Sequence, residues 1–503
     1  MTAWKSAIAS FVMAIIGWQF AAAPVFAARE GTERLSTWDQ RRMPIVYYAN
    51  ANDAAAWPEG VGAIIRSFMS WERVPGAYIA FVYGGTTDKK AAYDDGENVV
   101  TWVREGWPYG KDSVAFAVLW LSRDGQRIVG ADILLNGENF VWATNGDPEA
   151  VDVQNVMAHE VGHALGLGHS VTSPDLTMFP IIIPGETKKR FISEEERLIM
   201  KFIYPSGTTR VLTYTLSEGN GELLTKRAIA DYPPVPELET ISLLTRVDGD
   251  GDRLDEIGVI QEKDGLLGFY LFPAVTSGLP SSEAVAYDEW SIPGDDELDL
   301  TALDIDGDGI EEIGVLTAES DGTYALYIYA APWPSTFTED LAPQLVVKQP
   351  LRTAPGDNVL AAMGLDYDGD GVDEVGIVRL TPGGRYFFDV HSIEGDNNAV
   401  ETEVASLSLG VNPGFIDLDV SDVDGDGEWE LLALWRDSRR SYVSAFELLD
   451  EEPFSEKPQL TLVGTAPIAL PAGYRPTRLS SLRMEDADGF LRPAICVLVT
   501  EIP

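Results

Sequence analysis

The sequence is organised around one stretch of eleven residues, 159-HEVGHALGLGH-169. His159 and His163 are four residues apart, so on a helix both imidazoles lie on one face and can reach the same metal ion. Gly166 can adopt the left-handed conformation that ends a helix and turns the chain. This turn is expected to bring His169 back as a third nitrogen ligand, leaving the fourth position of a tetrahedral zinc open for water.

The spacing HExxHxxGxxH is far more specific than HExxH alone. Three of the four histidines in the chain fall within it, which argues against a helix that carries histidines by coincidence. We therefore predict one catalytic zinc ion held by His159, His163 and His169. Bound zinc would lower the pKa of its water to about 7, and Glu160 is predicted to take the proton of that water as a general base.

The composition predicts a folded, acidic protein of two or three domains. The chain has 503 residues, a hydrophobic content of 45% and a net charge of −44, from 80 acidic and 36 basic residues. Such a charge repels nucleic acid and anionic membranes, so we expect neither as a partner. The apolar content argues against disorder, and bound cations offer a way to neutralise the acids.

Residues 1–27 have the pattern of a secretory signal peptide. Lys5 precedes an apolar run over 7–23, and the small residues before Ala27 predict cleavage there, although an uncleaved anchor is the alternative. We expect a secreted protein, or one that is periplasmic or on the cell surface, without a membrane span after cleavage. The chain has a single cysteine, Cys496, so an intramolecular disulfide is excluded. We also expect the protein to be a monomer.

Apolar periodicity predicts an α+β domain over residues 43–205, preceded by a short segment at 28–42. A capping box at Ser193–Glu196 predicts a last helix. Its inward residues are expected to be Leu198, Ile199, Phe202 and Ile203. Strands are expected at 43–48, 78–83, 98–103, 114–121 and 128–135, and further helices at 58–71 and 153–167, the latter with Asp152 as N-cap.

This domain resembles the catalytic domain of matrixin-type metalloproteases of the metzincin clan. The resemblance is carried by the zinc-binding stretch, by Ser170 directly after it, and by Met178-Phe179-Pro180, which look like the Met-turn beneath the metal. It implies a structural role for Met178, a peptide substrate that pairs with an edge strand at 113–121, and transfer of the proton from Glu160 to the leaving amine. An S1′ pocket is expected between the metal helix and the loop 180–190.

The sequence departs from that family in two respects. No cysteine precedes Cys496, so the propeptide cysteine that inhibits animal members has no counterpart. The fourth histidine, His391, lies far outside the domain, so the second, structural zinc of those members is not expected. Phe179 stands where astacin- and serralysin-type relatives have a tyrosine, which favours the matrixin type.

Residues 206–503 contain an acidic loop that recurs at spacings of 56, 62 and 56 residues. Carboxylates at positions 1, 3, 5 and 9 of a tight loop suit Ca²⁺, so we predict about four structural calcium ions, with solvated turns as the alternative. The copies comprise Asp248, Asp250, Asp252 and Glu256; Asp304, Asp306, Asp308 and Glu312; Asp366, Asp368, Asp370 and Glu374; and Asp422, Asp424, Asp426 and Glu430.

These loops are not EF-hands, because position 12 falls within apolar β runs and is never Glu. They resemble FG-GAP/VCBS repeats, the calcium-loop blades of integrin-α-like β-propellers. The resemblance implies an all-β repeat domain. Because the first unit lacks its loop and the last lacks its later strands, we expect the two to share one blade, which gives about five blades.

The sequence therefore favours a secreted zinc endopeptidase, acting on protein or peptide substrates, with a calcium-stabilised propeller that targets or anchors it through a surface ligand. The alternative is an adhesion or ligand-binding propeller protein with a vestigial protease domain. A third possibility is removal of the propeller after secretion, leaving a fragment that ends near residue 206.

Overall fold

The structure of the chain is a computed structural model, and it describes most of the sequence after the expected signal peptide, which lies outside the described residues. The described ranges are 36–52, 57–91, 95–207, 209–219, 222–232, 241–249, 255–263, 266–272, 285–286, 296–319, 321–330, 344–351, 353–393, 403–410, 415–423, 429–436, 440–447, 461–470, 472–485 and 491–502.

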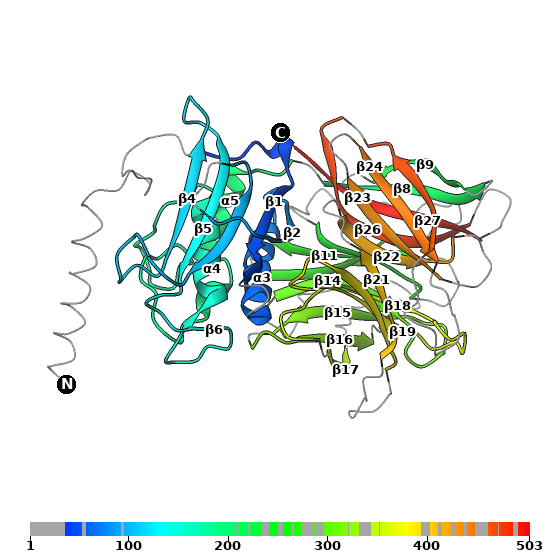
Figure 1. Cartoon of the computed structure of the whole chain (residues 1–503). Coiled ribbons are helices and arrows are strands. Elements are labelled where there is room, and N and C mark those ends of the chain that lie inside the picture. The colour runs from blue at the N-terminus through cyan, green and yellow to red at the C-terminus, as the bar shows by residue number, and fades with distance from the viewer. Residues whose placement is uncertain are drawn as a thin grey trace.

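The N-terminal part contains one five-stranded sheet with helices packed on it, as the α+β prediction requires (Figure 1). Its strand order is β2 (Phe81–Thr87), β1 (Ile45–Asn50), β3 (Asn98–Val103), β5 (Ile128–Asn136) and β4 (Ala115–Leu121). Strand β4 runs antiparallel to β5, whereas the other pairs are parallel. The α-helices are α3 (Pro58–Glu72), α4 (Val153–Ala164) and α5 (Glu194–Ile203), accompanied by short η1 (Gln40–Arg42), η2 (Lys188–Arg190), β6 (Trp142–Ala143) and β7 (Val151–Asp152).

The segment expected to precede this domain, residues 28–42, is part of the domain over its described portion. The Trp38 indole N–H donates to the Ala164 carbonyl at 2.8 Å, and the Trp38 backbone N–H donates to the Tyr204 hydroxyl at 3.0 Å. Gln40 reaches the carbonyls of Tyr78 and Pro205. The described part of this segment therefore packs on the domain through contacts with residues distant in sequence.

The side of helix α5 that faces the core overlaps only in part with the one predicted, since Ile199 and Ile203 pack against the core as expected. Leu198 and Phe202 are 57% and 84% exposed, whereas Glu196 and Met200 are fully buried. The capping box is also not formed in its usual way: Ser193 is the N-cap, but its hydroxyl bonds to the Glu196 carboxylate and caps no backbone N–H. The prediction is therefore wrong for Leu198 and Phe202, because the buried Glu196 carboxylate and Met200 occupy inward positions of the helix.

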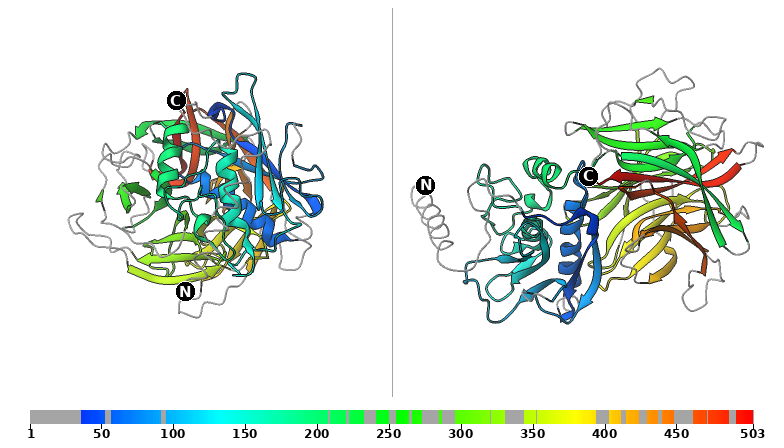
Figure 2. Two further views of the ribbon diagram at one scale, coloured as in Figure 1. Left: turned by 90° about the vertical axis from the view of Figure 1, so that its left-hand side faces the viewer. Right: turned by 90° about the horizontal axis from the view of Figure 1, so that it is seen from above.

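The C-terminal part consists, over its described residues, of five antiparallel sheets of four strands each (Figures 1 and 2). The strands are, sheet by sheet, β10 (Ile241–Val247), β11 (Glu256–Lys263), β12 (Leu266–Phe272) and β13 (Val285–Ala286); β14 (Asp296–Leu303), β15 (Glu312–Ala318), β16 (Tyr324–Ala330) and β17 (Gln344–Leu351); β18 (Asn358–Leu365), β19 (Glu374–Leu380), β20 (Tyr386–His391) and β21 (Glu403–Gly410); β22 (Phe415–Ser421), β23 (Glu430–Arg436), β24 (Ser441–Glu447) and β25 (Thr461–Ile468); and β26 (Tyr474–Glu485), β27 (Leu491–Glu501), β8 (Thr209–Gly219) and β9 (Glu222–Tyr232).

The last of these sheets joins the two ends of the C-terminal part, because β27 pairs with β8 over seven residue pairs, from Ala494↔Thr215 to Thr500↔Thr209. The first strands of the five sheets also contact one another in sequence. Strand β10 contacts β14, β14 contacts β18, β18 contacts β22, β22 contacts β26, and β26 contacts β10. Each sheet thus lies beside two others, and the fold of this part is all-β.

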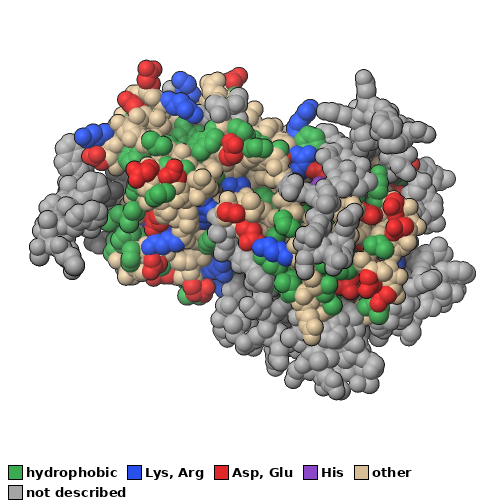
Figure 3. Space-filling view, turned by 90° about the horizontal axis from the view of Figure 1, so that it is seen from below, with side chains coloured by type: hydrophobic (Ala, Val, Ile, Leu, Met, Phe, Trp, Pro, Cys, Tyr) green, Lys and Arg blue, Asp and Glu red, His purple; other side chains and the backbone are tan. Residues whose placement is uncertain are grey.

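The described surface mixes charges of both signs. On the face drawn in Figure 3, acidic and basic side chains are interspersed over both parts of the chain. Among the residues that the structure describes, no helix combines the length and apolar character needed to cross a membrane.

Candidate active site

Helix α4 carries the first two histidines, and both of its ends are set by the residues that the sequence indicated. The Asp152 side chain accepts the Asn155 N–H at 2.9 Å, which confirms it as the N-cap. The helix ends at Ala164, three residues earlier than predicted, and Gly166 has a φ of 96°. A Cβ on Gly166 would lie 2.2 Å from the Ser36 carbonyl oxygen, so both the conformation and the space require glycine.

The turn at Gly166 brings His159, His163 and His169 together, with one ring nitrogen of each within 4.8 Å of the others. The Nδ1 atoms of His159 and His163 each lie 2.8 Å from a backbone carbonyl, of Thr177 and Leu167 respectively. Because a carbonyl only accepts, each Nδ1 must carry the hydrogen and each Nε2 a lone pair.

This donor set fits a zinc ion. The Nε2 atoms of His163 and His169 lie 3.1 Å apart. Burial lowers the pKa of all three imidazoles, and the neighbouring imidazoles add to this effect for His159 and His169; together these causes bring the pKa of His169 to about 3. The rings are therefore neutral at pH 7, which is the form that binds a metal, and three neutral nitrogens facing one another suit a tetrahedral zinc.

Glu160 lies beside these ligands and is 6% exposed. Without a bound cation, burial raises its pKa to about 8, against a hydrogen bond from the backbone N–H of Ala117 that acts in the opposite direction. A zinc ion held by the three histidines would lower this pKa and favour the ionised carboxylate that a general base requires. Ala117 belongs to β4, which lies at the edge of the sheet next to β5, as expected for residues 113–121. The predicted general base and the predicted peptide-binding edge are therefore in direct contact.

Met178 is buried against helix α4, at Gly162. Its side chain is 1% exposed, and its carbonyl accepts the N–H of Ser170 at 3.0 Å. A Cβ on Gly162, between the two helical histidines, would lie 2.3 Å from the Met178 sulfur and 2.9 Å from the Trp71 ring. Gly162 thus lets the methionine approach the metal helix, a role that the sequence analysis did not assign.

Glu196 is a further residue that the sequence analysis missed. It is fully buried, and its Oε1 accepts the backbone N–H of Met178 at 3.1 Å. Helix α5 therefore holds the backbone of Met178 in place through one carboxylate. The capping-box pattern drew attention to Glu196, but only the fold shows which N–H it binds.

Two of the three basic residues at the end of the loop 180–190, Lys189 and Arg190, are buried, whereas Lys188 is exposed. Arg190 is 2% exposed and donates from Nε and Nη2 to the two carboxylate oxygens of Asp152, at 2.9 and 2.5 Å. Lys189 is fully buried, with Nζ 3.1 Å from Glu186 Oε2, and its backbone N–H donates to Asn155 Oδ1 at 2.8 Å. The loop is therefore fastened to the first turn of α4.

The acidic repeat loops are described completely in the second and third copies. Carboxylate oxygens of Asp304, Asp306 and Asp308 lie within 4.8 Å of one another, as do those of Asp366, Asp368 and Glu374. Asp370 and Glu312 are outside those two clusters. Asp248, Glu256, Asp422 and Glu430 are described in the first and fourth copies, whereas Asp250, Asp252, Asp424 and Asp426 lie outside the described residues.

The glutamate at position 9 has the same contact in all four loops. Its carboxylate accepts the backbone N–H of the residue at position 2, which closes the loop. The donors to Glu256, Glu312, Glu374 and Glu430 are Gly249 at 3.1 Å, Ile305 at 3.2 Å, Tyr367 at 2.9 Å and Val423 at 2.7 Å.

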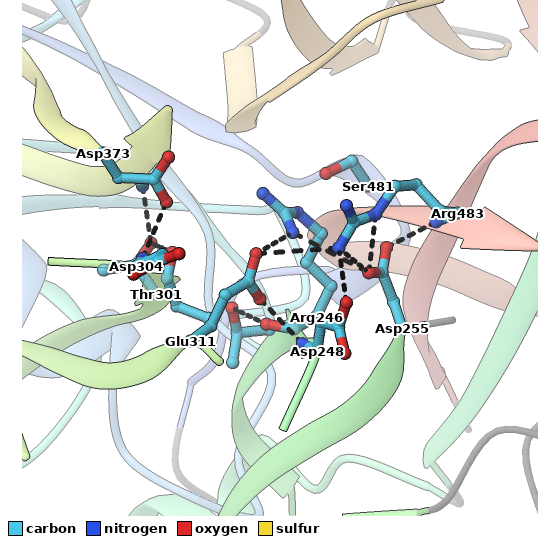
Figure 4. A network of polar contacts seen from close by, with 12 residues as sticks. Arg246, Asp248, Asp255, Thr301, Asp304, Glu311, Asp373, Ser481 and Arg483 are labelled. Atoms are coloured by element: carbon cyan, nitrogen blue, oxygen red, sulfur yellow. Dashed lines mark hydrogen bonds and ion pairs between the residues drawn. The ribbon is translucent and has the colours of Figure 1, made fainter. Parts of the chain in front are cut away.

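The acid at position 8 connects neighbouring loops (Figure 4). Glu311 accepts the N–H of Asp248 at 2.8 Å, and Asp373 accepts the N–H of Asp304 at 2.9 Å. Glu311 also pairs with Arg246, whose Nη1 lies 2.6 Å from Oε1. The first residue of a loop is thus oriented by the following repeat, a relation that the spacing alone did not reveal.

Comparison with known proteins places the N-terminal part in a known class. Residues 48–205 match the family model described as matrixin, which supports a zinc metalloendopeptidase of the matrixin type in this part of the chain. Metalloendoproteinase 4-MMP of Arabidopsis thaliana is 45% identical over 51 residues, which are 9% of this chain and 15% of that relative. The chain thus spans about 15% of the length of this curated relative.

Proposed function

We propose that the chain is a secreted zinc-dependent endopeptidase that hydrolyses peptide bonds of extracellular proteins, with Glu160 as general base. The observation that carries this proposal is the convergence of three neutral imidazoles beside a buried glutamate, next to an edge strand. The match of residues 48–205 to matrixins supports it independently.

The chain's own residues supply binding and proton transfer. The outer edge of β4, which no described strand pairs, accepts an extended peptide as an added strand, which holds the scissile bond near Glu160. Glu160 takes a proton from the attacking water and passes it to the leaving nitrogen. Zinc held by His159, His163 and His169 would supply a water of lowered pKa and polarise the carbonyl.

The C-terminal part of this protein is a five-bladed propeller stabilised by calcium, with a role in targeting or anchoring. Five sheets of four strands, a shared sheet built from both ends, and first strands that contact in sequence support this architecture. The clusters Asp304–Asp308 and Asp366–Glu374 support calcium as the ion, since several carboxylates on one loop suit it.

Glu160→Gln tests the enzymatic function. In the full chain, the variant is expected to lose about 10²- to 10⁴-fold in the rate of casein or peptide-library cleavage while keeping its zinc content, because the ligands are untouched. Equal inertness of wild type and variant on a broad library would refute the peptidase proposal and leave the adhesion alternative.

Separate return of the two ions tests their roles. After chelation, zinc alone is expected to restore cleavage at low temperature. Calcium alone is expected to stabilise the folded protein. At a calcium concentration a hundred times Kd, one site adds about 2.7 kcal/mol to the unfolding free energy, which is seen as a higher melting temperature. A melting temperature that does not respond to calcium would contradict the calcium assignment.

A further inference from the structure

A chain of partly buried hydrogen bonds crosses from the C-terminal part to the metal helix. Asn358, the first residue of β18, is fully buried. Its Oδ1 accepts from Arg66 Nη1 at 3.2 Å and from the Tyr324 hydroxyl at 3.1 Å. Arg66, on α3, also donates from Nε to Gln154 Oε1 at 3.1 Å. Gln154 belongs to the first turn of α4, so one guanidinium joins Asn358 to the helix that carries His159 and His163.

Helix α3 holds α4 at further points along its length. The Ser67 hydroxyl bonds to the Gln154 carbonyl at 3.2 Å, and the Trp71 indole N–H donates to the Ala158 carbonyl at 2.8 Å. Ala158 directly precedes the first histidine. Any displacement of α3 is therefore transmitted to the metal helix through side chains that bond to its backbone.

The C-terminal part contacts α3 backbone to backbone. A Cβ on Gly356 would lie 2.1 Å from the Pro58 carbonyl oxygen, and one on Gly62 would lie 2.5 Å from the Gly356 oxygen. Such close approach fixes the position of the helix start, because a packed interface of this kind cannot slide without separating. Helix α3 lies between the metal helix and β18 in the views of Figures 1 and 2.

The C-terminal part also covers strand β2, which is one edge of the N-terminal sheet. The hydroxyl of Tyr83, on β2, donates to the Pro382 carbonyl at 2.6 Å, and a Cβ on Gly384 would lie 2.6 Å from Gly85 Cα. One continuous apolar cluster includes Phe68 and Val156 from the N-terminal part and Met363 and Phe388 from the C-terminal part. Strand β2 is thus covered by the repeats, whereas β4 at the opposite edge is not paired on its outer side by any described strand.

We propose that Asn358 is a positioning residue for the metal-binding helix, acting through Arg66 and Gln154. The inference rests on the proposed peptidase function, and it assigns the C-terminal part a role in the catalytic unit in addition to any targeting role. A shift of a reacting group by about 1 Å can reduce a rate about a hundredfold, so the position of the first turn of α4 matters for the reaction. The shared core also disfavours removal of residues after 206 as a route to the active form.

Asn358→Ala in the full chain is the main test. It removes the acceptor of Arg66, so the guanidinium is expected to leave Gln154 for solvent. Amide hydrogen exchange in peptides covering residues 153–160 is expected to rise about tenfold, and kcat to fall about tenfold with little change in KM. Tyr324→Phe is the matched control, because it removes the other donor to Asn358 Oδ1 while leaving Arg66 in place; both readouts should stay at wild-type values.

Two further variants test the same link at Asn358 and at Gln154. Asn358→Asp restores an acceptor and is expected to rescue exchange and kcat. Gln154→Met removes the acceptor of Arg66 Nε at the α4 end of the link. Because Gln154→Met and Asn358→Ala interrupt the same link, the decreases in kcat in the double variant should not add. If Asn358→Ala does not fold, Gln154→Met alone decides through the same readouts.

The proposal is wrong if these variants leave kcat unchanged, or if exchange rises equally throughout the C-terminal sheets and not selectively in α4. These outcomes are distinct from failure of the peptidase function. Hydrogen exchange in α4 reports on the connection even in a protein without activity, whereas Glu160→Gln tests the activity without disturbing the connection.

Discussion

The sulfur of Met178 lies where the side chain of residue 162 would have to be, since a Cβ on Gly162 would come within 2.3 Å of it. Gly162→Ala is therefore expected to push the Met-turn away from the metal helix. We expect a loss of about 1–3 kcal/mol in unfolding free energy, as for other overpacked cores, together with weaker zinc retention against a competing chelator.

Gly130→Ala is the control for this substitution. Its Cβ would meet the Trp120 side chain at 3.5 Å, an ordinary contact, and its φ is not positive. Melting temperature and zinc retention should stay close to wild type. Equal decreases in melting temperature and zinc retention in the two variants would show that the contact with Met178 is not the reason why residue 162 must be glycine.

Glu196→Ala is expected to leave the buried N–H of Met178 without its acceptor. Because an unsatisfied buried donor costs about 1–3 kcal/mol, the melting temperature and the cleavage rate should both fall. Glu196→Gln keeps an oxygen acceptor and should recover most of the loss. Glu194→Ala, an exposed change in the first turn of the same helix, should cost under about 1 kcal/mol. A Glu196→Ala variant as stable as Glu194→Ala would contradict this role.

The stability of the protein should depend on pH through Glu72. Burial raises the pKa of Glu72 to about 7, although its Oε1 accepts the Phe81 N–H at 2.5 Å. Because the folded pKa lies above the unfolded one, this carboxyl contributes its stability below about pH 4.5, and the contribution is lost as the pH rises through about 7.

Glu72→Gln, which cannot ionise, should therefore match wild type near pH 5 and exceed it at pH 8 by about 1–3 kcal/mol in unfolding free energy. Chemical denaturation at the two pH values measures this difference. A difference between variant and wild type that is the same at both pH values would show that Glu72 does not titrate in this range.

Arg246→Met should destabilise the C-terminal part strongly. Arg246 is 7% exposed and pairs with Glu311, which is also 7% exposed, so the substitution leaves this buried carboxylate with only the more distant and more exposed Arg483, at 3.8 Å, as its cation. Removing one partner of such a pair costs about 3–5 kcal/mol, and Glu311→Gln in the same chain should return part of it.

The matched control is Lys348→Met, which breaks an ion pair with Glu319 at 3.0 Å in which the lysine side chain is 45% exposed. An exposed pair contributes under about 1 kcal/mol, so thermal unfolding should barely change. Comparable effects of the two substitutions would mean that burial does not set the strength of the Arg246 pair.

Local patterns predicted the elements that depend on near neighbours. The strands and helices of residues 43–205 lie close to their expected ranges, and the spacing of His159, Glu160, His163, Gly166 and His169 was sufficient to predict their convergence. A helix places residues i and i+4 on one face wherever it occurs, and a left-handed glycine turns the chain wherever it occurs. The acidic loops were equally visible, because each is built within nine residues.

The tertiary structure alone decided what those elements pack against. Leu198 and Phe202 fit an inward helical stripe, yet they are exposed because the Glu196 carboxylate binds the Met178 N–H on the inward side. Lys189 and Arg190 are residues of types that are usually exposed, yet they are buried and paired with Glu186 and Asp152. The link from Asn358 through Arg66 to Gln154 spans 292 and 88 residues of sequence. A hydrogen bond or buried ion pair depends on the position of its partner in space, and periodicity carries no information about partners at such separations.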